Sequence, residues 1–115
     1  MKILVTGGAG YIGSHVCKQL ALNGYIPITY DNLSRGNRWS VKWGPMEVGD
    51  ILNQIRLEEV ITRYEPDAVM HFAALAYVGE SVYNPHLYYN NNVCGTVNLL
   101  NVMDMYGCKM YVLIS

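Results

Sequence analysis

The chain has 115 residues, of which 51% are hydrophobic, and a formal net charge of −1. This length and composition predict one compact domain, and the small net charge gives no bulk attraction to nucleic acid or to an anionic membrane surface. No apolar run is long enough to span a bilayer, and the first residues lack the long apolar region of a signal peptide.

The first expected element is a strand over residues 2–6, because this run is short, apolar and rich in β-branched residues. Glycines in residues 7–10 interrupt it. A helix follows and ends at Asn23-Gly24, since these residue types tolerate a left-handed turn. Its expected apolar face consists of Ile12, Val16 and Leu20, which recur at helical spacing.

A second strand is expected over residues 25–30, with Pro27 near its start because proline cannot donate a ladder hydrogen bond. Residues 31–40 are polar and contain glycine, which predicts a loop, and residues 37–44 are left unassigned. Residues 46–48 predict a short third strand.

A second helix is expected after Asn53, a plausible N-cap, and it ends at Pro66-Asp67. Its apolar face is expected to consist of Leu57, Val60, Ile61 and Tyr64. Residues 68–74 predict a fourth buried strand, and residues 75–81 a loop.

A third helix is expected from Asn84-Pro85 to Gly107, because a cap residue followed by proline is typical of a helix start. Its expected apolar stripe is Val93, Val97, Leu100 and Met103. Residues 110–115 predict a fifth strand. The alternation of strands and helices predicts an α/β fold, a Rossmann-type doubly wound parallel sheet that is truncated after its fifth strand.

The stretch "VTGGAGYIG" at residues 5–13 places glycines between the first strand and the first helix. Gly7 permits a sharp turn, Gly10 permits close approach of a pyrophosphate, and Gly13 lets the helix pack close to the strand. A helix N-terminus attracts phosphate through its unpaired N–H groups and its dipole. The loop lacks the Gly-Lys-Ser/Thr of a P-loop, which argues against a nucleoside triphosphate. The alternative is a glycine-rich turn that binds nothing.

Asp31 stands at the end of the second strand, 18 residues after Gly13. A carboxylate there can accept hydrogen bonds from both hydroxyls of a ribose and would repel a 2′-phosphate, which favours NAD over NADP. The alternative is an aspartate that caps a turn. Arg35 and Arg38 follow closely and could meet a phosphate, so the preference for NAD is not absolute.

Five segments together resemble the N-terminal part of the UDP-glucose 4-epimerase family, a branch of the extended short-chain dehydrogenase/reductases. They read "VTGGAGYIGSH", "DNLSRGN", "GDI", "HFAALAYVGESV" and "YYNNNVCGTVNLL". The glycine loop and the acid mark only the superfamily, whereas "YVGES" and "YYNNNVCGT" are specific to the epimerase branch. The resemblance covers essentially the whole chain, which would be an NAD-binding domain over residues 1–115.

The resemblance implies that Tyr11 and Ile12 offer backbone N–H groups to the NAD pyrophosphate. It places the adenosine ribose against Asp31 and Asn32, with further loop residues lining the same site: Ser34, Arg35 and Gly36.

The resemblance also implies that Asp50 and Ile51 bracket the adenine, with the aspartate accepting from the exocyclic amine. The residues after the fourth strand would pass under the pyrophosphate and the nicotinamide ribose: Phe72, Ala73, Ala74 and Leu75. Asn91 would lie near the cofactor from the third helix.

Several of these residues have a purely structural alternative. Phe72 and the alanines could be strand-end packing, and Asn91 could be a surface residue among three consecutive asparagines. His71, inside an apolar strand, is interpreted as a core histidine rather than a base. Trp39 and Trp43 could pack over adenine or mark a contact surface, although ordinary packing is the interpretation favoured.

Two departures from the family limit the functional expectation. Ala76 stands where many epimerases carry a lysine that touches the pyrophosphate. The family's catalytic Tyr-x-x-x-Lys pair is absent, since no tyrosine of this chain has a lysine four residues later, and Ser115 falls one residue short of the catalytic serine or threonine. No catalytic residue is therefore assigned, and the nucleotide-sugar domain is also absent.

The family implies an NAD-dependent isomerase that interconverts UDP-glucose and UDP-galactose through a 4-keto sugar, in galactose and nucleotide-sugar metabolism. This chain alone is expected to be inactive and to bind NAD weakly. The open alternatives are another sugar-nucleotide enzyme, such as a 4,6-dehydratase, and a non-catalytic NAD-binding module. The fifth strand would leave an unpaired sheet edge, which predicts a homodimer or aggregation.

The three cysteines, Cys17, Cys94 and Cys108, are odd in number and show no CxxC spacing. This pattern argues against a disulfide framework and against a zinc site. Buried free thiols in a cytoplasmic protein are the expected outcome, and no metal, nucleic acid or membrane partner is expected.

Overall fold

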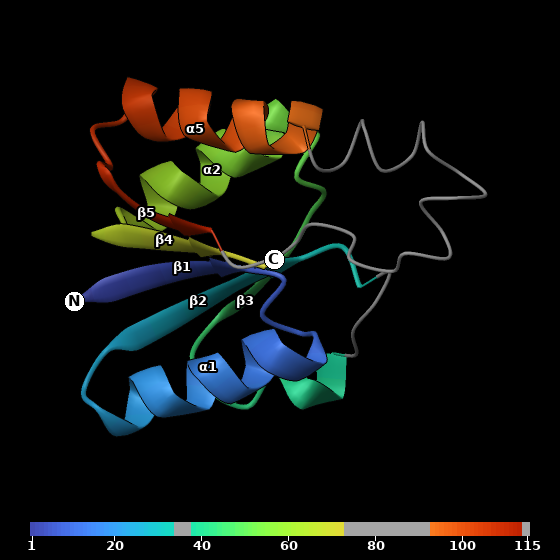
Figure 1. Cartoon of the computed structure of the whole chain (residues 1–115), viewed down its shortest axis with the longest axis vertical. Coiled ribbons are helices and arrows are strands. Elements are labelled where there is room, and N and C mark those ends of the chain that lie inside the picture. The colour runs from blue at the N-terminus through green and yellow to red at the C-terminus, as the bar shows by residue number, and fades with distance from the viewer. Residues whose placement is uncertain (34–37, 73–92, 114–115) are drawn as a thin grey trace.

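The computed structural model describes residues 1–33, 38–72 and 93–113. These residues form a parallel sheet of five strands in the order β3-β2-β1-β4-β5. Helices cover both faces of the sheet, with α1 on one face and α2 and α5 together on the other (Figure 1). The predicted Rossmann-type doubly wound sheet is confirmed.

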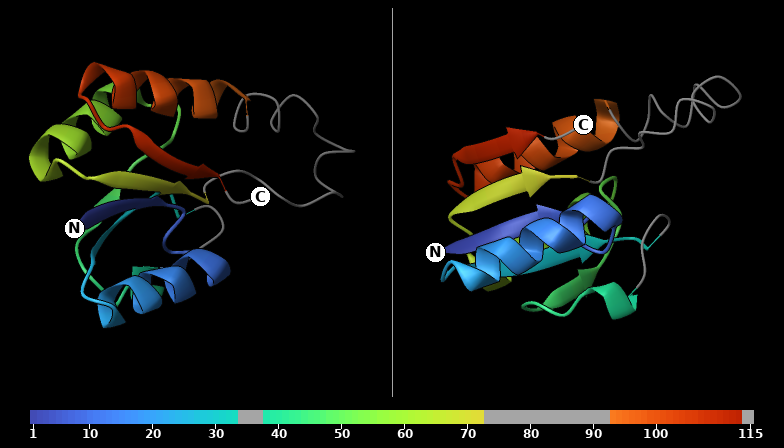
Figure 2. Two further views of the ribbon diagram at one scale, coloured as in Figure 1. Left: turned by 60° about the vertical axis from the view of Figure 1, so that its left-hand side comes forward. Right: turned by 60° about the horizontal axis from the view of Figure 1, so that its bottom comes forward.

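The elements follow the predicted order closely. The strands are β1 (Lys2–Thr6), β2 (Ile26–Asp31), β3 (Met46–Val48), β4 (Ala68–His71) and β5 (Met110–Leu113). The helices are α1 (Tyr11–Leu22), the short 3₁₀ helix η1 (Arg38–Ser40), α2 (Gln54–Tyr64) and α5 (Gly95–Met105). Two further views show that all strands run in the same direction between the two helical layers (Figure 2).

Boundary predictions were right to within a residue or two, with two exceptions. Strand β4 was predicted over residues 68–74 but ends at His71, and η1 occupies the end of the predicted loop over residues 31–40, whose first residue, Asp31, is the last of β2. The predicted helix start at Asn84-Pro85 lies outside the described residues. No helix in the described ranges is long and apolar enough to cross a lipid bilayer.

The larger core cluster lies between the sheet and the pair α2 and α5. It contains the central strand residues Leu4, Ile28 and Val69, all fully buried, together with apolar residues of both helices. The predicted face of α2 is confirmed, because its apolar positions are buried or pack against this cluster: Leu57, Val60, Ile61 and Tyr64. A smaller cluster lies under α1 and contains Ile3, Val5, Cys17 and Ala68.

The predicted helix ends are confirmed at each position that the structure describes, including the stop of α5 at Gly107, which takes a positive φ of 75°. Asn53 caps α2 by accepting a hydrogen bond from the Arg56 N–H at 3.1 Å. Asn23 follows the last residue of α1, and Gly24 takes a positive φ of 85°. Glu65 adopts a left-handed conformation between α2 and Pro66.

The predicted apolar face of α1 is wrong. Ile12 is 60% exposed and Val16 is only half-buried, whereas the buried residues are Gly13 and Cys17. The reason is the close approach of the helix start to the glycine loop, which turns Gly13 and the residue one turn later toward the sheet. Leu20 does pack against the smaller cluster.

The predicted stripe of α5 is also mostly wrong. Val93, Val97 and Leu100 are exposed, and only Met103 of the predicted set is buried. The helix instead buries Gly95, Leu99 and Val102. Gly95 lies so close to Ile51 that a Cβ at this position would stand 2.5 Å from the Ile51 Cγ2, and this contact sets the orientation of the helix.

Candidate functional site

The predicted site residues gather at one edge of the sheet, where parallel strands end. Gly7 follows β1, Asp31 ends β2, Asp50 lies two residues beyond β3, and Phe72 follows β4. Ligands of open α/β sheets bind outside the carboxyl ends of the strands, near the point where the strand order reverses. In this sheet that point lies between β1 and β4: after β1 the chain leads through α1 to β2 on one side, and after β4 it leads through α5 to β5 on the other, with the two helices on opposite faces (Figure 1).

The glycine loop makes the tight turn that its sequence predicts. Gly7 has a φ of 81°, which strains other residues, and its N–H donates to the Tyr30 carbonyl at 2.8 Å. The Gly10 N–H donates back to the Gly7 carbonyl at 3.1 Å. A Cβ on Gly13 would lie 2.2 Å from the Gly7 oxygen, so Gly13 lets α1 start directly against the loop.

The other two glycines of the loop differ in what surrounds them. A Cβ on Gly8 would lie 2.6 Å from the Thr29 Oγ1, so this residue packs on β2, a role that was not predicted. Among the residues that the structure describes, a Cβ on Gly10 would meet only the Gly7 oxygen, at 3.4 Å. No contact with these residues therefore requires glycine at position 10, and its role beside a pyrophosphate stays a prediction.

Helix α1 begins without a side-chain cap and without an acidic residue in its first turn. The side chains of Tyr11 and Ile12 are 82% and 60% exposed, so the predicted contribution of these residues rests on their backbone N–H groups. The positive end of the helix dipole is not offset by any local carboxylate of that turn. The start of α1 thus has the form of an anion-binding helix terminus.

Asp31 holds the glycine loop against the end of β2. The residue is 8% exposed, and its Oδ2 accepts from the Ala9 N–H at 3.0 Å. Its Oδ1 accepts from the Leu33 N–H at 2.7 Å, so the alternative of a turn-capping aspartate is confirmed, and the ribose contact stays a prediction. Two carboxylate oxygens offer about four acceptor positions, which leaves capacity for ribose hydroxyls. The adjacent Asn32 is exposed.

Asp50 and Ile51 differ in what they can offer a base. Asp50 is exposed, and its Oδ1 accepts from the Leu52 N–H at 2.9 Å. Ile51 is only 3% exposed, its side chain belongs to the larger core, and its carbonyl accepts from the Asn98 side chain at 2.9 Å. Any contact of Ile51 with adenine would therefore come from its backbone.

At the end of β4, Phe72 is half-buried and packs against the smaller core cluster, which is its structural alternative. Its N–H donates to the Thr6 carbonyl at 2.7 Å. The remaining predicted cofactor residues lie outside the described residues: Ser34, Arg35, Gly36, Ala73, Ala74, Leu75 and Asn91. The same holds for the departures at Ala76 and Ser115.

His71 is a core histidine, as interpreted from the sequence. It is fully buried, and its two ring nitrogens face the hydroxyls of Thr6 at 2.5 Å and Thr96 at 3.2 Å. Burial lowers the pKa of His71 from 6.5 to about 4, so the imidazole is neutral at pH 7. A neutral ring donates from one nitrogen and accepts at the other, which two hydroxyls can satisfy.

The tryptophans and cysteines divide between packing and exposure. Trp43 packs partly against the smaller core cluster, whereas Trp39 is 73% exposed on η1. None of the three cysteines forms a disulfide, but Cys94 is exposed, so the expectation of buried thiols holds only for the other two. Within the described ranges, no group of His, Cys, Asp or Glu could hold a metal ion.

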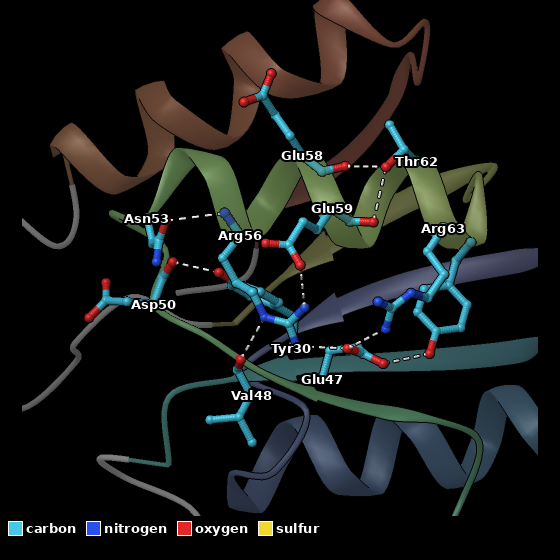
Figure 3. Close-up of polar contacts among 11 residues, drawn as sticks. Tyr30, Glu47, Val48, Asp50, Asn53, Arg56, Glu58, Glu59, Thr62 and Arg63 are labelled. Atoms are coloured by element: carbon cyan, nitrogen blue, oxygen red, sulfur yellow. Dashed lines mark hydrogen bonds and ion pairs between the residues drawn. The ribbon is translucent and has the colours of Figure 1, made fainter.

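Beside the site, a polar network that the sequence did not reveal ties β3 to α2 (Figure 3). Glu47 accepts from the Arg56 guanidinium at 2.7 Å, from Arg63 at 3.1 Å and from the Tyr64 hydroxyl at 2.6 Å. Hydrogen bonding from Tyr64, supported by the two arginines, lowers the pKa of Glu47. Arg56 also donates to the Val48 carbonyl at 2.9 Å, immediately before the Gly49-Asp50 turn.

Comparison with known proteins gives one family. Residues 3–115 match the model of the NAD dependent epimerase/dehydratase family. A UDP-glucose 4-epimerase of Rhizobium meliloti (strain 1021) is 54% identical over 114 residues. The alignment covers 99% of this chain and 35% of that relative, so the chain spans about a third of its length.

Solved structures give the same result. A UDP-glucose 4-epimerase from Brucella ovis in complex with NAD is 52% identical, with a TM-score of 0.95 over 97% of this chain and 34% of that one. The enzyme from Bifidobacterium longum, in complex with NAD⁺ and UDP, is 35% identical, with a TM-score of 0.94 over 100% of this chain and 37% of that one.

Proposed function

The chain belongs to the NAD dependent epimerase/dehydratase family, and we propose that it is the NAD-binding part of a UDP-glucose 4-epimerase. The observation that carries this proposal is the position of Asp31. Its carboxylate is buried at the end of β2, bonded to the glycine loop, and retains acceptor capacity for a ribose.

The residues present fit the adenosine and pyrophosphate parts of NAD. The uncapped start of α1 offers backbone N–H groups to the pyrophosphate, and Gly10 leaves space beside them. Asp31 would accept from the ribose hydroxyls and, because it is a buried anion, would oppose the 2′-phosphate of NADP. Asp50 would accept from the adenine amine.

In the longer enzyme that the relatives represent, NAD would take a hydride from the sugar and return it. Residues 1–115 would form the unit that binds and orients the cofactor. No tyrosine of this chain has a lysine four residues later, so the proton-transferring pair of the family is not within it. We therefore propose that the chain alone does not interconvert UDP-glucose and UDP-galactose.

Several further expectations are part of the proposal. The similar proteins named as UDP-glucose 4-epimerases favour this reading over a 4,6-dehydratase. The UDP-sugar would be a substrate of the longer enzyme, in galactose metabolism. The buried thiols of Cys17 and Cys108, which form no disulfide, support a cytoplasmic location. A homodimer is a further part of the proposal.

The test is an isothermal calorimetric titration of the purified chain with NAD and, separately, with NADP. We expect millimolar-range binding of NAD, weaker binding of NADP, and loss of both in Asp31→Ala. The matched control is Asp67→Ala, because Asp67 also accepts a backbone N–H, that of Lys2, but at the opposite end of β1. Absence of heat with millimolar NAD would contradict the proposal, and turnover of UDP-galactose by the chain would contradict its inactivity.

A further inference from the structure

We propose that Tyr30 is a positioning residue for the adenine end of the cofactor site, and that its hydroxyl sets the place of Asp50. The inference rests on the proposed binding of NAD. It is carried by the contacts of Tyr30, which connect the glycine loop, the ribose-binding acid and the turn after β3.

Tyr30 reaches the Gly49-Asp50 turn from inside the fold. It is 1% exposed, and its hydroxyl donates to the Asp50 carbonyl at 2.6 Å (Figure 3). Burial raises the pKa of Tyr30, so the hydroxyl keeps the proton that it donates. The backbone carbonyl of the same residue accepts from the Gly7 N–H at 2.8 Å. One residue therefore contacts both ends of the predicted adenosine site.

The turn itself is shaped around the tyrosine ring. A Cβ on Gly49 would lie 2.4 Å from the Tyr30 oxygen and 2.6 Å from two ring carbons. The Gly49 N–H donates to the Asp31 carbonyl at 3.1 Å. The turn can therefore lie directly on the ring only because residue 49 has no side chain.

The order of these groups matches the order of the parts of a dinucleotide. The glycine loop follows β1, Asp31 ends β2 and Asp50 follows β3, and these three strands are neighbours in the sheet. A pyrophosphate on the loop and a ribose on Asp31 place the base beyond β2, at the end of β3. The Asp50 carboxylate then faces the base, and the Tyr30 hydroxyl holds the backbone of Asp50 from inside the fold.

The strength of such an acceptor depends on its position, because a hydrogen bond weakens steeply when its geometry is poor. Tyr30→Phe removes the hydroxyl, but the Asp50 carbonyl still accepts from the Asn53 N–H at 3.0 Å. The variant thus frees the turn without leaving that carbonyl unpaired. Its effect should appear in recognition of the adenine amine.

The experiment measures the dissociation constants of NAD and of nicotinamide hypoxanthine dinucleotide, in which a carbonyl replaces that amine, for the wild-type chain and Tyr30→Phe. We expect the wild type to prefer NAD by about tenfold or more, because a carboxylate that accepts from an amine repels a carbonyl oxygen. In Tyr30→Phe the preference should fall to about twofold. The ratio of the two constants on one sample cancels any unfolded fraction.

Tyr64→Phe is the matched control. It removes a tyrosine hydroxyl that donates a hydrogen bond of the same length, 2.6 Å to Glu47, at the other end of the polar network between β3 and α2. Its preference for NAD should equal that of the wild type. An unchanged ratio in Tyr30→Phe, or an equal fall in both variants, overturns the inference. If the wild-type chain binds neither dinucleotide, the proposed function fails instead, and this inference falls with it.

If Tyr30→Phe does not fold, Gly49→Ala gives a second reading, because its methyl group would displace the turn from the same ring. It should also reduce the preference for NAD over the hypoxanthine analogue. A preference equal to that of the wild type would contradict the role of this contact.

Discussion

The N–H of Ala9 donates to the Oδ2 of Asp31 at 3.0 Å, which joins the glycine loop to the end of the neighbouring strand. The Asp31 carboxylate, which would bind a ribose, therefore stabilises the glycine loop in the free protein as well. Its second oxygen binds the Leu33 N–H. Replacing the carboxylate should affect folding as well as binding.

Asp31→Asn should lower the free energy of unfolding by about 1–3 kcal/mol without any ligand, because the new amide group must face one of the two N–H donors. Chemical denaturation checks this. In the control Asp67→Asn, the amide can turn its oxygen to the exposed Lys2 N–H, and the loss should stay below about 0.5 kcal/mol. Equal losses in the two variants would contradict this role of Asp31.

Gly13→Ala and Gly10→Ala should separate folding from binding. The Gly13 methyl group would overlap the Gly7 carbonyl, so we expect a loss of about 3 kcal/mol or more in the free energy of unfolding. Gly10→Ala meets no such contact and should cost about 1 kcal/mol or less. It should nevertheless weaken NAD binding at least about tenfold, because a methyl group would enter the proposed pyrophosphate space. A stable Gly13→Ala chain, or normal NAD binding by Gly10→Ala, would refute the respective assignment.

His71 should make the fold acid-sensitive well above the range of carboxyl titration. Its pKa is about 4 in the fold and 6.5 when unperturbed, so the unfolded chain binds the proton more readily between these values. The contribution of neutral His71 to the free energy of unfolding is fully present above pH 6.5. It is lost as the pH falls toward 4, by a total on the order of 3 kcal/mol.

Denaturation curves at several pH values check this prediction. His71→Asn should remove most of the decline between pH 6.5 and 4, whereas His15→Asn, which changes an exposed histidine on α1, should leave it. A wild-type stability that stays constant over this range would be incompatible with a neutral buried His71.

Glu47→Gln should loosen β3 from α2. The charged partner of Arg56 and Arg63 is lost, and we expect a decrease of about 1–2 kcal/mol in the free energy of unfolding. The pKa of Glu47 is lowered in the fold, so its contribution is present above the ordinary value of 4.5 and disappears as the pH falls through the folded value.

The variant should therefore lose its difference from the wild type in strong acid, which thermal unfolding at pH 7 and pH 3 can measure. Glu58→Gln is the control, because the Glu58 carboxylate accepts from the Tyr106 hydroxyl at the surface. A difference that persists unchanged at pH 3 would show that the carboxylate charge is not what stabilises this contact.

The sequence was sufficient for the sheet, the order of elements and the ends of α1 and α2. Alternating apolar runs and turn residues such as Asn23-Gly24 act locally, so they can be recognised in the chain. The glycine loop and Asp31 were recognisable for the same reason, since their spacing is local.

The faces of α1 and α5 could not be predicted in this way. In both helices the closest approach is made by a glycine, at Gly13 and Gly95, and the residue one turn later follows it into the core. A prediction based on the large apolar residues therefore assigns the wrong face of such a helix to the core. The role of Tyr30 was not predicted because its partner Asp50 is 20 residues distant, although a tyrosine in a buried strand was a usable signal.

The position of β1 in the middle of the sheet has a consequence for how the chain folds. Ile3 pairs with Pro27 on one side and with Ala68 on the other. The first pairing closes a short segment through α1 and can form early, whereas the second must wait until β4 has been synthesised and a much longer segment has closed. Until then one edge of β1 stays open during synthesis, and this stage is when the nascent chain is most prone to aggregate.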